Sequence, residues 1–245
     1  AGDGSITGAY AKSAERGTLQ INAKSVILAT GGWAQNKDYV AQRGFIYDNI
    51  RYGGTDGHDG DGITMASAVG ARNFVSSSTF NSTNTIGDFP YKSTFIWNAG
   101  GGGTCLFVNE NAERFVNEDF AINNFELQSV PAMTQRQIYT VFDRAILEDW
   151  LAEAPDELAT VDSSTDEALA KADTIAEAAS AIGLDADTLA ATVEQYNKLV
   201  SSGTDTDFGK ANVYLKPIEK APFYVGKLTQ ELLVGIGGVE TNRFG

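Results

Sequence analysis

Two residue types that many active sites require are almost missing from this 245-residue sequence, which has one cysteine, Cys105, and one histidine, His58. A single cysteine cannot form a disulfide within the chain, and one cysteine with one histidine cannot assemble a Cys/His zinc site. A Ser-His-Asp hydrolase would have to use His58, yet no serine lies in a G-x-S-x-G motif. Disulfide frameworks, Cys/His zinc sites and this hydrolase class are therefore excluded.

Cations and long apolar runs are also scarce. The chain has 18 Lys and Arg against 32 Asp and Glu, a formal net charge of −14 with the histidine neutral. Because phosphate contacts need a surplus of cations, generic nucleic-acid binding is excluded. No apolar run approaches the roughly 18 residues of a membrane helix, so we expect no membrane span in this segment. The remaining composition, 42% hydrophobic and 20% charged, is that of one large or two modest globular domains.

Patterns of apolar residues predict an α+β fold that contains a mixed sheet. Residues 5–11 and 18–21 alternate around a turn, which is typical of two short strands. Residues 25–29 are almost continuously apolar, as a strand covered on both faces of a parallel or mixed sheet requires. Further strands are predicted over 105–108, 114–116 and 138–142, and helices over 63–69, 144–154 and two stretches that begin near Thr174 and near Asp185 or Asp187.

Two glycine-rich segments, 30–32 and 53–62, interrupt these elements. The second precedes a predicted helix, and backbone N–H groups at such a helix terminus can face an anion. Neither segment fits the G-x-G-x-x-G fingerprint, so neither alone predicts an independent nucleotide site. The aspartates of the second segment lack the sixth-position glycine and final glutamate of an EF-hand, and no metal site is predicted. His58 in this segment is interpreted as an exposed loop residue, with a catalytic role as the alternative.

Six short motifs follow one another over nearly the whole chain. They occupy residues 26–32, 60–66, 113–118, 189–197, 221–224 and 237–239. Each is weak alone, but the set in this order is specific. On these residues the sequence resembles the FAD-dependent flavoproteins of the fumarate reductase/succinate dehydrogenase type, as a central fragment of a longer protein.

The resemblance implies a partial, discontinuous Rossmann-like FAD-binding domain over 1–74 and 225–245, with an inserted α+β capping domain over 75–224 that covers the substrate. Glycines permit close approach of the backbone to a dinucleotide, and an aspartate can accept hydrogen bonds from a cofactor hydroxyl or amide. The family's G-x-G-x-x-G unit and its returning glycine-rich segment are not found in this sequence, so we expect the fragment alone to bind FAD weakly or not at all. The cofactor-binding residues implied by the resemblance are Ala29, Thr30, Gly31 and Asp61.

The sequence departs from the family pattern where fumarate would be bound and protonated. The family's proton-donating arginine, four residues after the R-F-x-N-E motif, is replaced by Ile122. The glutamate and arginine that supply that acid correspond to Asn98 and Gly101. Two substrate-binding histidines correspond to residues 81–83 and to a position near Val234. These replacements predict a substrate other than fumarate.

No catalytic residue is assigned from the sequence. Arg114 and Glu118 are predicted to be structural, as an ion pair or as a hairpin anchor. Phe95, Trp97 and the glycines at 100–103 either line an apolar pocket or belong to the core. The residues predicted to face the substrate are Asn98, Asn81 and Tyr91, and the groups chemically able to move a proton are Tyr91, Lys92 and Tyr139.

These observations predict a segment of an FAD-dependent oxidoreductase that reduces an unsaturated small molecule by hydride transfer from flavin. The flavin would receive its electrons from a donor domain or a donor protein. Two alternatives stay open. The first is a catalytically silent binding or scaffold module that keeps the capping-domain fold, and the second is a calcium-dependent carbohydrate-binding module.

Overall fold

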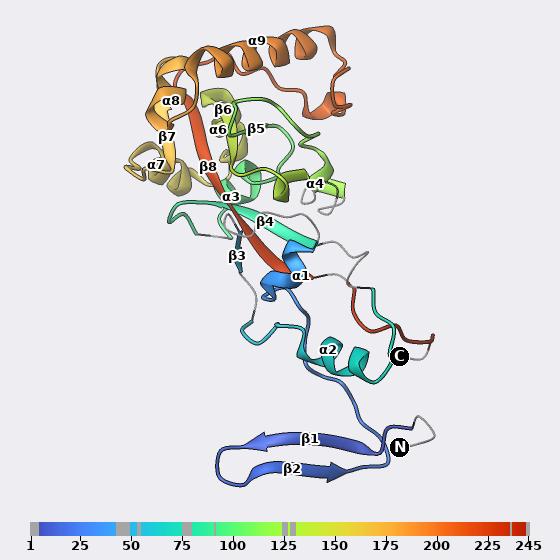
Figure 1. Cartoon of the computed structure of the whole chain (residues 1–245). Coiled ribbons are helices and arrows are strands. Elements are labelled where there is room, and N and C mark those ends of the chain that lie inside the picture. Colours follow the sequence, from blue (N-terminus) through green and yellow to red (C-terminus); the bar gives the residue numbers. More distant parts are fainter. Residues whose placement is uncertain are drawn as a thin grey trace.

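A long central strand organises the computed structural model of the chain (Figure 1). Strand β8 (Phe223–Gly235) pairs on one edge with β6 (Ile138–Asp143) and β3 (Ile50–Tyr52), and on the other with β7 (Leu169–Ala172) and β4 (Phe80–Ile86). Only β3 is parallel to β8, so the predicted mixed sheet is confirmed. The structure describes residues 5–42, 50–52, 55–74, 80–90, 92–123, 127, 131–235 and 237–243.

The larger hydrophobic core surrounds the first half of β8. Strand β5 (Leu106–Asn109) extends the sheet beside β6, and every residue of both strands is buried. The helices packed around this half are α3 (Thr94–Ala99), α6 (Arg144–Trp150), α7 (Pro155–Asp162), α8 (Ile175–Ile182) and α9 (Ala186–Ser202) (Figure 1).

Local signals place the last two of these helices. The predicted capping box of α8 is present, because Thr174 Oγ1 accepts from Glu177 N while the Glu177 carboxylate accepts from Thr174 N. Asp185, and not Asp187, caps α9 by accepting from Thr188 N. Gly183 ends α8 in a left-handed conformation, as its sequence position predicts.

A smaller core lies at the other end of β8. It joins α1 (Lys37–Ala41) and α2 (Asp61–Ala68) to the sheet. The helix predicted over residues 63–69 is therefore present as α2, which begins two residues earlier, at Asp61, and ends at Ala68. The buried residues of this core are Trp33, Ala34, Val40, Ile63, Met133 and Leu232.

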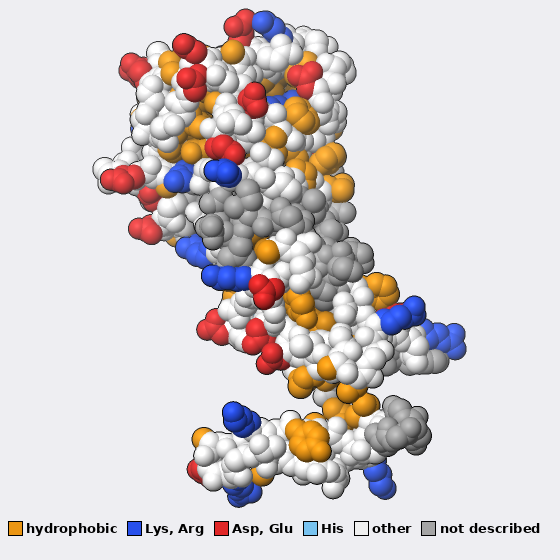
Figure 2. Space-filling model, in the orientation of Figure 1, with side chains coloured by type: hydrophobic (Ala, Val, Ile, Leu, Met, Phe, Trp, Pro, Cys, Tyr) orange, Lys and Arg blue, Asp and Glu red, His pale blue; other side chains and the backbone are white. Residues whose placement is uncertain are grey.

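The N-terminal hairpin lies apart from both cores (Figure 1). Strands β1 (Gly8–Ser13) and β2 (Gly17–Asn22) pair antiparallel around the predicted turn. The prediction of a strand over 25–29 is wrong: the segment is not a strand, and the side chain of Ile27 is 88% exposed. The reason is that a strand requires a hydrogen-bonded neighbour, and no described strand lies beside this segment. Figure 2 shows hydrophobic side chains exposed on this part of the surface.

Two further predictions need correction. Residues 114–116 form no strand, because Arg114 makes a single bridge to Val108 and turns its guanidinium into a buried ion cluster. The helix predicted over 144–154 ends at Trp150. Pro155, which the sequence predicts to end that helix, instead begins α7. Proline suits the first turn of a helix, where its missing N–H would have no partner within the helix.

The predicted domain boundary between residues 224 and 225 stays a prediction. Strand β8 is continuous across it: residues 223–226 pair with both β6 and β7, while residues 228–235 pair with β4. Among the described residues, no helix has both the length and the apolar character needed to cross a bilayer.

Candidate functional site

The two glycine-rich segments of the sequence meet in the structure. We call residues 29–32 the first turn and residues 55–60 the second loop. Gly60 N donates a hydrogen bond to Gly32 O at 3.0 Å, which joins the two backbones directly. The second loop ends at α2, whose first residue is Asp61. Two segments separated by more than twenty residues in sequence therefore form one surface.

Gln35 holds the second loop against the first turn. Its Oε1 accepts hydrogen bonds from Gly57 N at 2.8 Å and from His58 N at 3.1 Å, and its Nε2 donates to Asp56 Oδ1 at 3.0 Å. The backbone N of Gln35 donates to His58 O at 2.8 Å. The sequence gives no signal for this role, because the role depends on which loop lies opposite the side chain.

The contact between the turns leaves no room for side chains at two glycines. A β-carbon on Gly62 would lie 2.0 Å from Thr30 Oγ1, and one on Gly31 would lie 2.4 Å from His58 Cδ2. Gly31 also has φ +72°, a conformation that favours glycine. The glycines are therefore required by the packing of the two segments.

The four residues predicted to bind the cofactor lie on this joined surface. Ala29, Thr30 and Gly31 are exposed along the first turn, and Asp61 is exposed at the start of α2. Their contact with FAD stays a prediction. The structure shows that the two segments that carry these residues lie side by side.

Tyr52 and His58 form a short polar contact beside the first turn. The Tyr52 hydroxyl lies 2.6 Å from His58 Nδ1 and donates to Thr55 O at 2.8 Å. Burial raises the pKa of Tyr52, and the nearby Asp56 carboxylate raises it further. The phenol therefore keeps its proton near neutral pH.

The predicted substrate-facing residues have mixed outcomes. Asn98 lies in α3, is half-buried and donates from Nδ2 to Thr94 O within its own helix. Asn81 lies in β4, where its backbone pairs with Val234 of β8. The two segments that the resemblance aligns with the family's substrate histidines, residues 81–83 and the position near Val234, thus lie on neighbouring strands. Tyr91 lies outside the described residues, and the contact of any of these residues with a substrate stays a prediction.

The remaining proton-transfer candidates occupy different environments. Lys92 is exposed before α3, whereas Tyr139 is buried in β6. Burial and the Glu110 carboxylate raise the pKa of Tyr139. Phe95 is part of the large core, while Trp97 is largely exposed on the same helix. Of the two roles predicted for Phe95, lining a pocket and packing in the core, the structure therefore supports packing in the core.

Ile122 lies on α4 (Phe120–Asn123) and is 42% exposed. A β-carbon on Gly103 would lie 2.6 Å from Ile122 Cδ1 and 3.3 Å from the ring of Tyr214. Gly103, at φ +83°, therefore lets an aliphatic and an aromatic side chain converge. Ile122, at the position that the resemblance assigns to the family's proton-donating arginine, has no group that can donate a proton.

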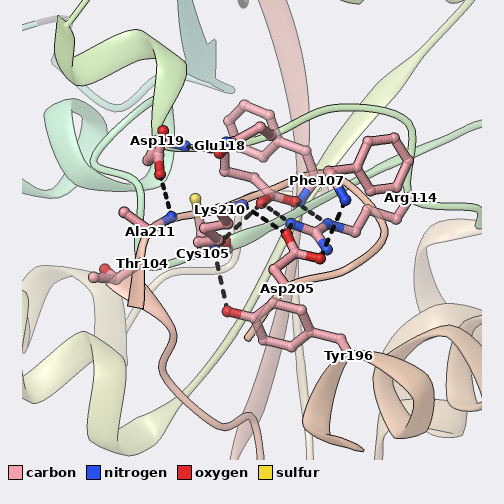
Figure 3. Close-up of polar contacts among 12 residues, drawn as sticks. Thr104, Cys105, Phe107, Arg114, Glu118, Asp119, Tyr196, Asp205, Lys210 and Ala211 are labelled. Carbon is pink, nitrogen blue, oxygen red and sulfur yellow. Dashed lines mark hydrogen bonds and ion pairs between the residues drawn. The ribbon is translucent and has the colours of Figure 1, made fainter. Parts of the chain in front are cut away.

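A buried ion cluster fixes the segment that leads into α4 (Figure 3). The predicted Arg114–Glu118 pair is confirmed as a two-bond contact, with Nε to Oε1 at 2.9 Å and Nη2 to Oε2 at 2.8 Å. Arg114 also reaches Asp205 at 2.7 Å, and Lys210 Nζ lies 3.3 Å from Glu118 Oε2. Two cations and two anions thus balance one another inside the protein, as buried charges require.

The cluster changes the ionisation of its members. Burial alone would lower the pKa values of Arg114 and Lys210, but Glu118 together with Asp205 at Arg114, and with Tyr196 and Cys105 at Lys210, raises both. For Asp205, burial favours the neutral form, yet the hydrogen bond from Arg114 and nearby backbone N–H groups lower its pKa to about 2. Arg114, Lys210 and Asp205 therefore stay charged near neutral pH.

Lys210 extends the cluster to neighbouring segments. Its Nζ donates to Cys105 O at 2.6 Å and to Tyr196 OH at 3.1 Å, and the adjacent Ala211 N donates to Asp119 Oδ2 at 2.6 Å. These bonds tie α9 and β5 to the residues just before α4 (Figure 3). Because Ile122 follows directly, the cluster determines where that side chain is placed.

Comparisons with known proteins match the whole chain. The family model described as FAD binding domain matches residues 1–245. A vinyl phenol reductase of Lactiplantibacillus plantarum is 28% identical over 97% of this chain and 53% of its own length, and a fumarate reductase (cytochrome) of Shewanella frigidimarina is 29% identical over 96% and 39%. The open conformation of a flavocytochrome c3 fumarate reductase has a TM-score of 0.62 at 27% identity, over 99% of this chain and 41% of that one. The chain thus spans about half or less of each relative's length.

Proposed function

Because this chain belongs to the family of the FAD binding domain, we propose that it is the central part of an FAD-dependent oxidoreductase that reduces an unsaturated substrate other than fumarate. FAD is the cofactor of that family, and the matched relatives include reductases. The observation that carries the proposal is the direct contact between the first turn and the second loop, which places the exposed residues Thr30 and Asp61 on one surface.

The residues of this surface fit a dinucleotide. Gly31 and Gly62 let the two segments pack against each other, and Asp61 presents a carboxylate at the start of α2. Ala29, Thr30 and Gly31 would lie along the cofactor, and Asp61 would accept a hydrogen bond from one of its hydroxyl or N–H groups. When bound, FAD supplies a flavin ring that exchanges hydride with a substrate.

The proposed substrate class rests on Ile122 of α4 and Val234 of β8. Ile122 and Val234 are aliphatic and partly exposed, so neither can form an ion pair with a carboxylate. Substrate carboxylates are normally held by arginine or by hydrogen-bond donors. We therefore favour an uncharged or aromatic alkene over a dicarboxylate. The name of the vinyl phenol reductase supports such a substrate in a relative.

The chain's own residues position these groups. The buried ion cluster holds α4, and Gly103 admits Ile122 and Tyr214 to the same corner. Isoleucine has no proton to donate, so the proton that completes reduction must come from another group. We propose Lys92 or Tyr91 as the source of this proton. Electrons would reach the flavin from a donor domain or donor protein.

The proposal is tested by purifying the full-length protein that contains this chain. We expect a yellow protein whose reduced flavin is reoxidised by vinyl phenols or similar alkenes faster than by fumarate. A colourless protein that takes up no added FAD would rule the proposal out. A flavin-loaded protein that no alkene reoxidises would instead favour the silent binding or scaffold module, which the isoleucine at position 122 motivates.

A further inference from the structure

We propose that His58 is an additional cofactor-contacting residue of this surface, whose imidazole is held in one tautomer by Tyr52 so that Nε2 accepts a hydrogen bond from a hydroxyl or N–H group of the nucleotide. This inference rests on the proposed function, because it assumes that FAD lies along the first turn. It assigns a role to the one histidine of the chain.

Hydrogen-bond accounting fixes the tautomer. The Tyr52 hydroxyl has one proton and faces two partners, Thr55 O at 2.8 Å and His58 Nδ1 at 2.6 Å. A carbonyl oxygen can only accept, so the hydroxyl proton goes to Thr55 O. Nδ1 must then donate its own proton to the phenol oxygen. In the neutral ring this leaves the lone pair on Nε2.

The free edge of the ring lies against the predicted cofactor turn. A β-carbon on Gly31 would be 2.4 Å from His58 Cδ2 and 2.7 Å from Nε2, so only glycine allows the ring to lie there. Within the described part of the chain, no hydrogen bond to Nε2 is formed, and the ring is half-buried. An acceptor nitrogen therefore stands next to a turn whose backbone is exposed.

The position of the ring is fixed before any ligand arrives. Gln35 accepts from His58 N and donates to His58 O, while Tyr52 holds Nδ1. Three contacts on one residue limit its freedom, and preorganised groups lose less entropy on binding. Asp61, three residues later, is the second acceptor on the same surface. A nucleotide that presents several donors would be recognised by both.

Two variants distinguish the contributions of the two ring nitrogens, Nδ1 and Nε2. His58→Asn keeps a polar group near the Nδ1 position and can still meet Tyr52, whereas His58→Gln reaches the Nε2 position with an amide oxygen that can accept. In the full-length apo-protein, we expect His58→Asn to weaken FAD binding about three- to tenfold, the range for one neutral hydrogen bond. His58→Gln should stay closer to the wild-type dissociation constant.

A second readout does not depend on FAD. Nitrogen NMR of the full-length protein with labelled histidine, with the signal assigned through its loss in His58→Asn, should show a proton on Nδ1. In Tyr52→Phe the proton should move to Nε2, because the acceptor for Nδ1–H is gone. A wild-type protein with the proton on Nε2 would overturn the proposal.

The outcomes also separate this inference from the proposed function. A wild-type protein that binds no FAD contradicts both. A wild-type protein that binds FAD while His58→Asn binds it equally well contradicts the role of His58 alone. The expected pattern, weaker binding by His58→Asn together with the Nδ1–H tautomer, supports both.

Discussion

Gly62 lies so close to Thr30 that a β-carbon on Gly62 would come within 2.0 Å of Thr30 Oγ1. This contact joins the start of α2 to the first turn. It explains why a glycine stands inside a helix, where it usually costs stability relative to alanine. The two segments can share a surface only while this position has no side chain.

Replacing Gly62 by alanine should therefore destabilise the protein, although alanine favours helix. We expect a loss of about 1 to 3 kcal/mol in the free energy of unfolding, typical of overpacking. Urea unfolding of Gly62→Ala measures it. In a Thr30→Ala background the loss should be smaller, because the clashing hydroxyl is absent. Equal losses in both backgrounds would show that the Thr30 contact is not the cause.

The buried cluster should be sensitive to loss of a single charge. Lys210→Met leaves Glu118 with one cation fewer at a fully buried site, and removing one partner of a buried pair costs about 3 to 5 kcal/mol. Lys198→Met is the matched control, because the Lys198–Glu194 pair is exposed and should change stability little. Similar effects of the two variants, measured by urea unfolding, would contradict the account of the cluster.

Asp205 should make stability depend on acidic pH. Its folded-state pKa of about 2 lies below the ordinary 3.8, so the folded protein holds its carboxylate ionised where the unfolded chain takes up a proton. The resulting stabilisation, about 2 kcal/mol, is present above pH 4 and is lost between about pH 4 and 2. The free energy of unfolding of Asp205→Asn should lack this part of the pH dependence. The prediction would be wrong if the free energy of unfolding of the wild type and that of Asp205→Asn had the same slope against pH between about pH 4 and 2.

Cys105 should be inert in the folded protein. Burial raises the pKa of its thiol to about 11, although Lys210 acts in the opposite direction. Only the thiolate reacts with disulfide reagents. We expect no labelling at pH 8 under native conditions and complete labelling after unfolding in urea. Fast labelling of the native protein would show that the segment before β5 opens readily.

The features that the sequence predicts well are local. The hairpin around residues 13–17 and the capping box at Thr174 depend on neighbours within a few residues. The Arg114–Glu118 pair is also local, because its two residues lie within one motif and four positions apart. Asp205 and Lys210, its further partners, come from a segment about ninety residues away, and no local pattern indicates them.

The candidate surface was predicted only in part. The structure brings the motifs at residues 26–32 and 60–66 into contact, and the cofactor-binding role of their four residues stays a prediction. Gln35 and Tyr52 were missed, because their roles depend on which loop each side chain faces. The strand predicted over 25–29 failed for the opposite reason: its apolar pattern is strong, but a strand also needs a neighbour.

The central claim is that the first turn and Asp61 together hold FAD, and an equilibrium titration of the full-length apo-protein with FAD tests it most directly. Quenching of flavin fluorescence should report binding by the wild type. Asp61→Asn should bind about 10- to 100-fold more weakly, because a charged hydrogen-bond acceptor is lost. No binding by the wild type, or equal affinities of the two proteins, would contradict the account.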